Sequence, residues 1–532
     1  MRLLPPNTYA ADPALRSLLR AWLRPETLEW AEPELDRLGA LAAGELPRLG
    51  AECEARPPWL RTVEPWGERV DEVVYPEAWW RLAEIAARLG LAGLPYEEEA
   101  LGLGGPEVRV VHSALCYLFE PQTATYMCPV SMTDAAARVL IDFGPESLRR
   151  EVVPHLVSRD PGEAWTAGQW MTELHGGSDV GANAVEARRA DGAWRLYGRK
   201  YFCSNVGGQV VLALARPDGA GPGTRGLGLF LVPRLLADGS RNRYRIDRLK
   251  DKLGTRAMAT GEVTLEGAHA ELVGDVERGF SQMTPMLNIT RLHNGIASAA
   301  GLRRGLQLAR GYAAQRSAFG RPLDQLPLQR QVLVELAVQA EAALVLTMRL
   351  AALLGRLECG LATPDERLVF RLGSSLTKLY TARQAVAGAS EVIEAFGGAG
   401  YMEDTGIARL LRDAQVLPIW EGTTNVLSLD ALRTVARPGV AEAFLGELER
   451  LGAPGRAALE SVMGRLRGQD PDLVQRQGRR FAFQAAEAWI AGLLREAAGR
   501  GPREAAVAEL WDARGEPDGT AEDLFALVVD GE

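Results

Sequence analysis

Two changes of periodicity limit how this chain can fold. Apolar residues recur at helical spacing up to about residue 160, as in the run from Ala78 to Leu89. Between about residues 165 and 274, short β-rich runs replace this pattern, with turn signals such as Asp191-Gly192 between them. Helical spacing returns after Met283. A Rossmann fold is disfavoured, because no strand leads into a GxGxxG motif and no alternation of strands and helices follows.

We therefore predict an α+β, multidomain protein. It has an N-terminal α-helical domain, a middle antiparallel β-domain, a C-terminal domain resembling a four-helix bundle, and extra C-terminal helices. The predicted boundaries are 1–162, 163–278, 279–437 and 438–532. The clearest predicted strands are Ala193 to Tyr197, Val210 to Ala215, Leu227 to Val232 and Val263 to Leu265. Three long helices are predicted at about 283–315, 325–358 and 365–396.

Composition excludes several classes of function. The net charge is −9, so the chain as a whole has no electrostatic footprint for nucleic acid. The five cysteines show no CxxC spacing and the five histidines no HxxxH spacing, so we expect neither a disulfide framework nor a bound metal. No run of about 18 apolar residues lacks a charge, and Met1 to Pro6 do not resemble a signal peptide. We expect a cytoplasmic protein that does not span a membrane.

Lysine is scarce in this sequence. Of 60 basic residues, only Lys200, Lys250, Lys252 and Lys378 are lysines. A coding bias towards arginine explains the skew. The remaining lysines are then expected at positions where a guanidinium would not serve, although chance placement is the alternative.

Two stretches of the β-region have features of a cofactor site. In Gln169 to Val180, Gly176 and Gly177 let backbone amides approach an anion, and Ser178 adds a hydroxyl donor. Thr172 and the backbone near Met171 can hydrogen-bond a flat heterocycle. The alternative is an ordinary glycine-rich turn.

The second stretch runs from Gly198 to Asn205. In a regular strand Lys200, Phe202 and Ser204 face the same side, which would form one wall of a flat cofactor. An ordinary half-buried strand is the alternative.

A third stretch, from Leu417 to Asn425, predicts a positioned carboxylate. It is expected to be a short extended link between two helices, with Thr423, Thr424 and Asn425 available to cap the second helix. Glu421 lies beside Gly422 in this link. The alternative is that Glu421 is one of many surface glutamates.

These stretches, taken in order, resemble the acyl-CoA dehydrogenase superfamily. The matching strings are MTELHGGSDV, GRKYFCSN, KDKLGTR, QRSAFGRP, EAFGGAGY and IWEGTTN, over roughly residues 75 to 436. The chain is most similar to the AidB-like, alkylation-response branch. That likeness rests on Trp420, on the block MCPVSMTDAA, on RLKDKLGTR and on the extra C-terminal helices.

The resemblance implies non-covalently bound FAD at the junction of the β-domain and the bundle. It also implies a homotetramer in which neighbouring subunits share FAD sites. The cofactor-binding residues implied by the matching strings are Met171, Thr172, Gly177, Ser178, Phe202, Ser204, Arg316, Ser317, Phe319, Glu394, Gly397, Gly398, Trp420, Thr423 and Asn425.

The resemblance also implies that Glu421 is the catalytic base of an acyl-CoA dehydrogenase. The base removes the α-proton of an acyl-CoA thioester while the β-hydrogen leaves as hydride to flavin N5. Burial beside the flavin is expected to raise the pKa of this glutamate. Arg291 matches an arginine near the site, which orients the carboxylate or the substrate. A purely structural salt bridge is the alternative for Arg291.

Some positions depart from the family pattern. Asn288 replaces a common acidic residue, which puts a contact with CoA in question. Glu394 replaces a glutamine and would bring negative charge near a pyrophosphate. Electron-transfer flavoprotein is the expected electron acceptor. DNA binding through the C-terminal helices, where Arg476, Arg479 and Arg480 cluster, is an alternative function that the acidic tail does not favour.

Overall fold

The computed structural model describes residues 3–122, 126–466, 468–514 and 524–531. The chain forms two compact units, each built from separate stretches of sequence. The unit that we call the β-unit contains Leu46–Glu97 and Gln122–Thr290. The unit that we call the helical unit contains Met1–Glu45, Glu98–Pro121 and Arg291–Glu532. This grouping differs from four consecutive domains, so the boundaries given above stay a prediction.

A seven-stranded sheet is the centre of the β-unit, with strand order β3-β6-β4-β5-β9-β7 and β8 beside β9. Strand β6 also pairs with β7, so the pairing closes on itself. The four predicted strands are confirmed within β5, β6, β7 and β9. Most pairs are antiparallel, as predicted, but β6 runs parallel to both β3 and β4. The strands are β3 (Ala167–Trp170), β4 (Glu186–Ala190), β5 (Ala193–Ser204), β6 (Val210–Pro217), β7 (Gly228–Pro233), β8 (Tyr244–Leu249) and β9 (Thr260–Leu272).

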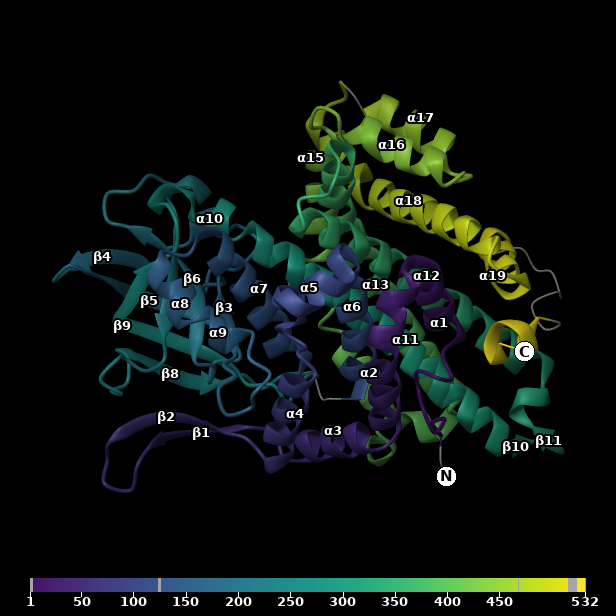
Figure 1. Cartoon of the computed structure of the whole chain (residues 1–532), viewed down its shortest axis with the longest axis horizontal. Coiled ribbons are helices and arrows are strands. Elements are labelled where there is room, and N and C mark those ends of the chain that lie inside the picture. The colour runs from purple at the N-terminus through teal and green to yellow at the C-terminus, as the bar shows by residue number, and fades with distance from the viewer. Residues whose placement is uncertain (1–2, 123–125, 467, 515–523, 532) are drawn as a thin grey trace. The chain divides into compact units, whose positions relative to one another are not determined.

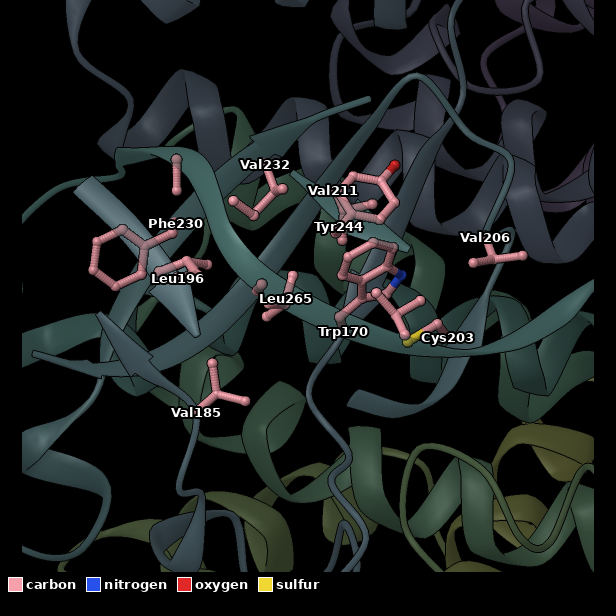
Figure 2. Close-up of a cluster of buried hydrophobic side chains, with 14 of the residues drawn as sticks. Trp170, Val185, Leu196, Cys203, Val206, Val211, Phe230, Val232, Tyr244 and Leu265 are labelled. Atoms are coloured by element: carbon pink, nitrogen blue, oxygen red, sulfur yellow. The ribbon is translucent and has the colours of Figure 1, made fainter. Parts of the chain in front are cut away.

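The core of the β-unit consists of side chains from the inner faces of these strands. Figure 2 shows Trp170, Phe230 and Tyr244 among branched aliphatic residues. The rings of Trp170 and Tyr244 meet edge to face, with centroids 5.2 Å apart. The predicted Asp191-Gly192 turn joins β4 to β5. Both of its residues have positive φ, 52° and 77°, as a tight two-residue hairpin requires.

The N-terminal region contains a β-hairpin that the sequence did not predict. Strand β1 (Trp59–Val63) pairs antiparallel with β2 (Arg69–Val74). Val73 of this hairpin joins the core of the β-unit and Leu60 packs against that core, whereas Trp66 at the turn is 98% exposed. Burial does not follow an apolar alternation along the hairpin, since the polar Asp71 is also buried, so pattern analysis missed it. The helices of the β-unit include α4 (Glu77–Arg88), α7 (Met127–Phe143), α8 (Glu146–Glu151), α9 (Val153–Leu156) and α10 (Gly279–Gln282), and α3 (Glu45–Ala55) begins at its boundary.

The helical unit is organised around three long helices, whose predicted ranges are confirmed. They are α11 (Thr284–Gln315), α12 (Pro327–Glu358) and α13 (Pro364–Ala395). A capping box starts α13, because the Thr363 hydroxyl accepts from the Glu366 amide while the Glu366 carboxylate accepts from the Thr363 amide. Helix α12 has the length and hydropathy of a membrane span, but 83% of its apolar stretch is buried inside the protein, as in a core helix.

Shorter helices surround the three long ones. They are α1 (Pro13–Trp22), α2 (Pro25–Ala43), α5 (Glu98–Gly104), α6 (Val108–Phe119), α14 (Ile407–Ala414), α15 (Thr424–Val435), α16 (Val440–Arg450), α17 (Arg456–Leu466), α18 (Pro471–Ala498) and α19 (Pro502–Asp512). Every residue of α6 is buried. Its Arg109 forms a bidentate ion pair with Glu358 of α12, with N–O distances of 2.6 and 2.7 Å.

The extra C-terminal helices pack directly on the bundle. Helix α18 contacts α12, α13 and α15 (Figure 1). Its Trp489 is fully buried. Arg503 of α19 binds both carboxylate oxygens of Glu341 in α12, at 3.2 and 2.5 Å. These helices therefore belong to the core of the helical unit.

Gly373 of α13 tests this packing. A Cβ atom at Gly373 would lie 2.6 Å from two ring carbons of Trp489. We expect Gly373→Ala to destabilise the protein by about 1–2 kcal/mol, because overpacking against a rigid indole exceeds the gain in helix propensity of about 1 kcal/mol. Chemical denaturation measures the difference.

Gly446 of α16 is the matched control, because no atom of the described residues lies within 4 Å of a Cβ placed there. Gly446→Ala is expected to stabilise the protein slightly, by up to about 1 kcal/mol. Equal effects at the two glycines would contradict the packing of α18 on α13.

Candidate active site

Glu421 lies in a sequence of turns between α14 and α15. The prediction of an extended link was wrong: residues 415–422 form consecutive turns, and Glu421 has a φ of +55°. This left-handed conformation costs a residue with a side chain roughly 1–2 kcal/mol. Gly422 follows with a φ of +107°. A non-glycine residue keeps such a positive φ only where surrounding contacts enforce it.

The end of this loop is fixed by the start of α15. Thr423 is the N-cap of that helix, and its hydroxyl accepts a hydrogen bond from the Val426 amide at 3.4 Å. This confirms the predicted capping by Thr423. Further back, the Asn294 side chain of α11 donates to the Leu417 carbonyl at 3.2 Å. The loop is therefore attached at both ends.

Asp430 of α15 binds charged and polar side chains of α11 and α13. Its carboxylate accepts two hydrogen bonds from Arg371, at 3.0 and 2.8 Å, and one from the Ser375 hydroxyl at 2.6 Å. Arg291 of α11 contributes a third cationic contact at 3.4 Å. Burial by itself raises the pKa of Asp430, but its hydrogen bonds with Arg371 and the charges of Arg371 and Arg291 hold this pKa well below its usual range.

Arg291 also contacts the loop of residues 415–422 directly. We call this segment the base loop, after the predicted base Glu421. Its Nε donates to the Glu421 carbonyl oxygen at 3.4 Å. Burial lowers the pKa of Arg291, while the carboxylates of Asp430 and Glu421 oppose that effect. The structural salt bridge considered for Arg291 is present, and the same side chain holds the backbone of Glu421. Its predicted contact with substrate stays a prediction.

One buried cation of this site was not among the predicted site residues. Lys378 of α13 donates from Nζ to the Gly422 carbonyl oxygen at 2.6 Å. The only signal for it in the sequence was the scarcity of lysine. The donor and the acceptor lie 44 positions apart in the sequence, so no local pattern could have revealed the contact.

In the β-unit, the first predicted cofactor stretch follows β3 and has a fixed backbone. The Met171 carbonyl accepts from the Asn183 side chain at 2.9 Å, and the Thr172 carbonyl accepts from the Tyr201 amide at 3.0 Å. A Cβ at Gly177 would lie 2.6 Å from the Thr172 hydroxyl oxygen, so only glycine lets these two segments approach so closely. Gly177 and Ser178 are both exposed.

The second stretch contains a break in strand register that overturns one prediction. Lys200 does not share a face with Phe202, because β5 is irregular between Lys200 and Cys203 in its pairing with β9. Lys200 is buried and donates to Glu173 at 2.8 Å, whereas Phe202 is 53% exposed. Burial lowers the pKa of Lys200, against the raising effect of Glu173. Phe202 and Ser204 remain available to a ligand without Lys200.

Glu173 explains why this strand is irregular. Its carboxylate accepts from the amides of Ala184 and Val185, at 2.7 and 3.1 Å, in addition to the Lys200 ammonium. The ion pair draws Lys200 into the interior and fixes the backbone that follows Thr172. A buried pair with its remaining oxygens satisfied in this way is tolerated inside a protein.

The remaining predicted cofactor residues of the helical unit lie at the ends of α11 and α13. A small hairpin is formed by β10 (Ser317–Ala318) and β11 (Arg321–Pro322). Arg316 precedes it, Ser317 lies in β10, and Phe319 lies in the turn and is 94% exposed. The rings of Tyr312 and Phe396 stack with centroids 4.3 Å apart. Because Tyr312 lies one turn before Arg316 and Phe396 lies just before Gly397, this stack brings the two segments together.

The glycine turn next to this hairpin is open. No atom of the described residues lies within 4 Å of a Cβ placed on Gly397 or Gly398. Glu394 is exposed. An exposed carboxylate can turn away from a bound pyrophosphate, which removes the objection raised by its charge.

Each unit, taken by itself, carries groups that match part of the chemistry of FAD. The β-unit offers an exposed aromatic ring, two serine hydroxyls and the exposed Gly176-Gly177 turn. The helical unit offers the Arg316 guanidinium and the Gly397-Gly398 turn. The indole Nε1 of Trp420, beside Glu421, is buried without a hydrogen-bond partner among the described residues. An aromatic surface with scattered donors suits a flat flavin joined to a pyrophosphate.

Sequence comparison decides the family. Residues 2–161 match the adaptive response protein AidB N-terminal domain, residues 168–268 the acyl-CoA dehydrogenase middle domain, and residues 277–436 the acyl-CoA dehydrogenase C-terminal domain. The chain belongs to the acyl-CoA dehydrogenase superfamily. The N-terminal match confirms the AidB-like branch. The family uses FAD, and this chain is one of its FAD-dependent oxidoreductases.

Individual relatives cover most of the chain. Acyl-CoA dehydrogenase family member 11 of Caenorhabditis elegans is 40% identical over 477 residues, which are 88% of this chain and 75% of that protein. The putative acyl-CoA dehydrogenase AidB of Escherichia coli strain K12 is 34% identical over 439 residues, 81% of this chain and 78% of that protein. The crystal structure of Caenorhabditis elegans ACDH-11 in complex with C11-CoA aligns with a TM-score of 0.89 and 37% identity, covering 96% of this chain and 92% of that one.

The Asp430 cluster makes a prediction about pH and stability. Asp430→Asn is expected to lower the free energy of unfolding at pH 7 by about 2–3 kcal/mol, because Arg371 and Arg291 lose their counter-ion. The carboxylate pKa is depressed in the folded state, so its stabilisation is complete above the unfolded pKa of about 4 and is lost as pH falls below it. The difference between the two proteins should therefore shrink below about pH 4.

Denaturant unfolding at several pH values measures this effect. Asp365→Asn in the exposed first turn of α13 serves as the control and should change stability by less than about 0.5 kcal/mol. A constant deficit of Asp430→Asn from pH 7 to pH 3 would show that its carboxylate charge is not what stabilises the cluster.

Proposed function

We propose that this acyl-CoA dehydrogenase removes the α-proton of an acyl-CoA thioester with Glu421, producing a 2,3-enoyl thioester. One observation carries the proposal. Glu421 is held at positive φ, with its carbonyl bound by Arg291 and the following helix capped by Thr423. A carboxylate on a fixed backbone can be aimed at one carbon atom, which a flexible surface glutamate cannot do.

The chemistry explains why the backbone matters. The α-proton of a thioester is weakly acidic, so hydrogen bonds must stabilise the charge that develops on the thioester oxygen as the proton leaves. The backbone N–H of Glu421 is the proposed donor from this chain. The proton passes to the Glu421 carboxylate, and two electrons leave with the β-hydrogen as hydride. Bound FAD supplies the hydride acceptor.

The residues proposed to hold FAD form three groups. Met171 and Thr172 would contact the flavin ring, Gly177 and Ser178 its ribityl–pyrophosphate chain, and Phe202 and Ser204 would flank the ring. Trp420, Thr423 and Asn425 lie around the base. A third group, Arg316, Ser317, Phe319, Glu394, Gly397 and Gly398, is proposed to reach the FAD of a neighbouring subunit.

The substrate is proposed to carry an acyl chain of medium length. The support is the ACDH-11 structure, whose ligand is C11-CoA, at 37% identity over nearly the whole chain. An acyl-CoA series centred on eleven carbons is therefore the first to test. Electron-transfer flavoprotein is proposed as the acceptor of the electrons.

DNA binding remains the second candidate, and no contact among the described residues favours it. Arg476, Arg479 and Arg480 are exposed on the first turns of α18. An exposed row of three arginines is common on soluble helices, and the chain carries a net charge of −9. The cytoplasmic location also stays a proposal. All five cysteines lie in the described part of the chain and none forms a disulfide, as a reducing compartment favours.

Replacing the base tests the proposed function. Glu421→Gln is expected to retain FAD, because no flavin contact is proposed for its carboxylate, and to slow flavin reduction by acyl-CoA at least about 1000-fold. Anaerobic stopped-flow absorbance measures the bleaching of the flavin. Glu403→Gln, which removes an exposed partner of Arg412, is the control and should reduce the flavin at the wild-type rate. Turnover by Glu421→Gln at an undiminished rate would rule out Glu421 as the base.

Subunit assembly provides a separate test. If Phe319 reaches a neighbour's FAD, Phe319→Asp should lower both the tetramer fraction and the bound flavin, because a charge replaces an exposed aromatic contact. Light scattering and the flavin-to-protein absorbance ratio measure the two effects. Trp66→Asp alters an equally exposed aromatic residue outside the predicted flavin segments and should change neither. A tetramer with full FAD in Phe319→Asp would refute the shared site.

A further inference from the structure

Lys378 occupies an unusual position for a charged side chain. It lies in the middle of α13 and is fully buried, as are its neighbours Thr377 and Leu379. A buried ammonium is costly unless it is paired and hydrogen-bonded. Its Nζ donates to the Gly422 carbonyl oxygen at 2.6 Å, so the side chain is directed at the base loop.

The base loop is held from two helices. Arg291 of α11 donates to the Glu421 carbonyl, and Lys378 of α13 donates to the next carbonyl along the chain. These two carbonyls follow the Cα of Glu421, whereas its amide precedes that Cα. Fixing them, with φ at +55°, also fixes the direction of the Glu421 N–H. The two cations therefore stabilise a backbone conformation that a glutamate would otherwise avoid.

We propose that Lys378 is a positioning residue for the base: it fixes the Glu421 loop through the Gly422 carbonyl, and its charge favours the ionised Glu421 carboxylate. The inference rests on the proposed function of Glu421. It adds to that function a residue that does not touch the substrate.

The charges around Lys378 support this role. Among the described residues, the charged groups that act on it are Glu421 on the loop and Arg291 on α11. Behind them Asp430 of α15 offsets Arg291 and Arg371. Burial lowers the pKa of Lys378 to about 7, while the Glu421 carboxylate acts in the opposite direction. Attraction between two groups is mutual, so an ammonium that gains from the carboxylate also lowers the pKa of that carboxylate.

The geometry also explains why this position is lysine in an arginine-rich chain. The acceptor of the Lys378 ammonium is a single carbonyl oxygen, on a residue whose Cβ side is filled. A Cβ on Gly422 would lie 2.9 Å from the Leu427 side chain. An ammonium is a compact donor that suits a single acceptor, whereas a guanidinium is a planar fork that needs several. This matches the expectation from the scarcity of lysine.

The experiment compares Lys378→Met with the wild-type protein, both loaded with FAD. Flavin reduction by saturating undecanoyl-CoA is followed anaerobically from pH 5.5 to 9. The variant is expected to reduce flavin at least about tenfold more slowly at pH 7. The acidic limb of its pH–rate profile should be displaced to higher pH by about one unit. The displacement is upward because a carboxylate without a nearby cation holds its proton to higher pH. The acyl-CoA concentration at half-saturation should change less than about threefold.

Arg349→Met is the matched control, because it removes another cation of the bundle, one paired with Glu447 at 3.0 Å. It should lower stability but leave the pH profile unchanged, since a general loss of packing does not move the ionisation of Glu421. If Lys378→Met does not fold, Lys378→Gln serves instead, because it is also neutral but keeps a donor. A wild-type rate and profile in the neutral variant that folds would overturn the inference.

A second readout separates this inference from the proposed function. If no acyl-CoA bleaches the wild-type flavin, the proposed function fails. The Glu421 carboxyl can still be titrated by infrared difference spectroscopy, with its band identified by its loss in Glu421→Gln. If the Glu421 carboxyl titrates with a higher midpoint pH in Lys378→Met than in the wild type, the role of Lys378 is supported. Equal midpoints would overturn that role whether or not the protein turns over.

Discussion

The carboxylate of Asp430 is the interaction on which the candidate active site depends. It binds Arg371 and Ser375 from α13 and Arg291 from α11, so one side chain of α15 fixes this helix against two others. Because α15 begins directly after the base loop, its position determines where Glu421 can be. Arg291 extends the same network to the Glu421 carbonyl. The position of Glu421, the proposed base, is thus set by ion pairs within the bundle.

Several features of the site destabilise the folded protein locally. A glutamate at positive φ costs roughly 1–2 kcal/mol, and each buried cation carries a desolvation penalty of several more. Stable packing alone would favour aliphatic residues at Arg291 and Lys378. The proposed role of Glu421 accounts for their presence, because an aimed and ionised carboxylate needs a fixed backbone and nearby positive charge. Elsewhere in the bundle, the buried pairs Arg109–Glu358 and Arg503–Glu341 join helices and have no such role.

Local sequence patterns were sufficient to predict much of the fold. The Thr363-Pro364 start of α13 and the Asp191-Gly192 turn were predictable because each depends on neighbouring residues. The capping by Thr423 was predictable for the same reason. In contrast, the direction of Lys200 depends on Glu173, 27 positions away, and an ion pair at that distance overrides strand alternation. The contact of Lys378 with Gly422 is equally non-local. The positive φ of Glu421 could not be read from sequence, since non-glycine residues rarely adopt it.

The central claim is that Glu421 in this loop removes the α-proton of an acyl-CoA while the β-hydrogen leaves as hydride. The most direct measurement is the isotope effect on flavin bleaching when the FAD-loaded protein is mixed anaerobically with undecanoyl-CoA deuterated at C2 and C3. We expect deuterium to slow the bleaching several-fold, with 2-undecenoyl-CoA as the product by mass spectrometry. A fully loaded flavin that acyl-CoAs of any chain length leave oxidised would contradict it.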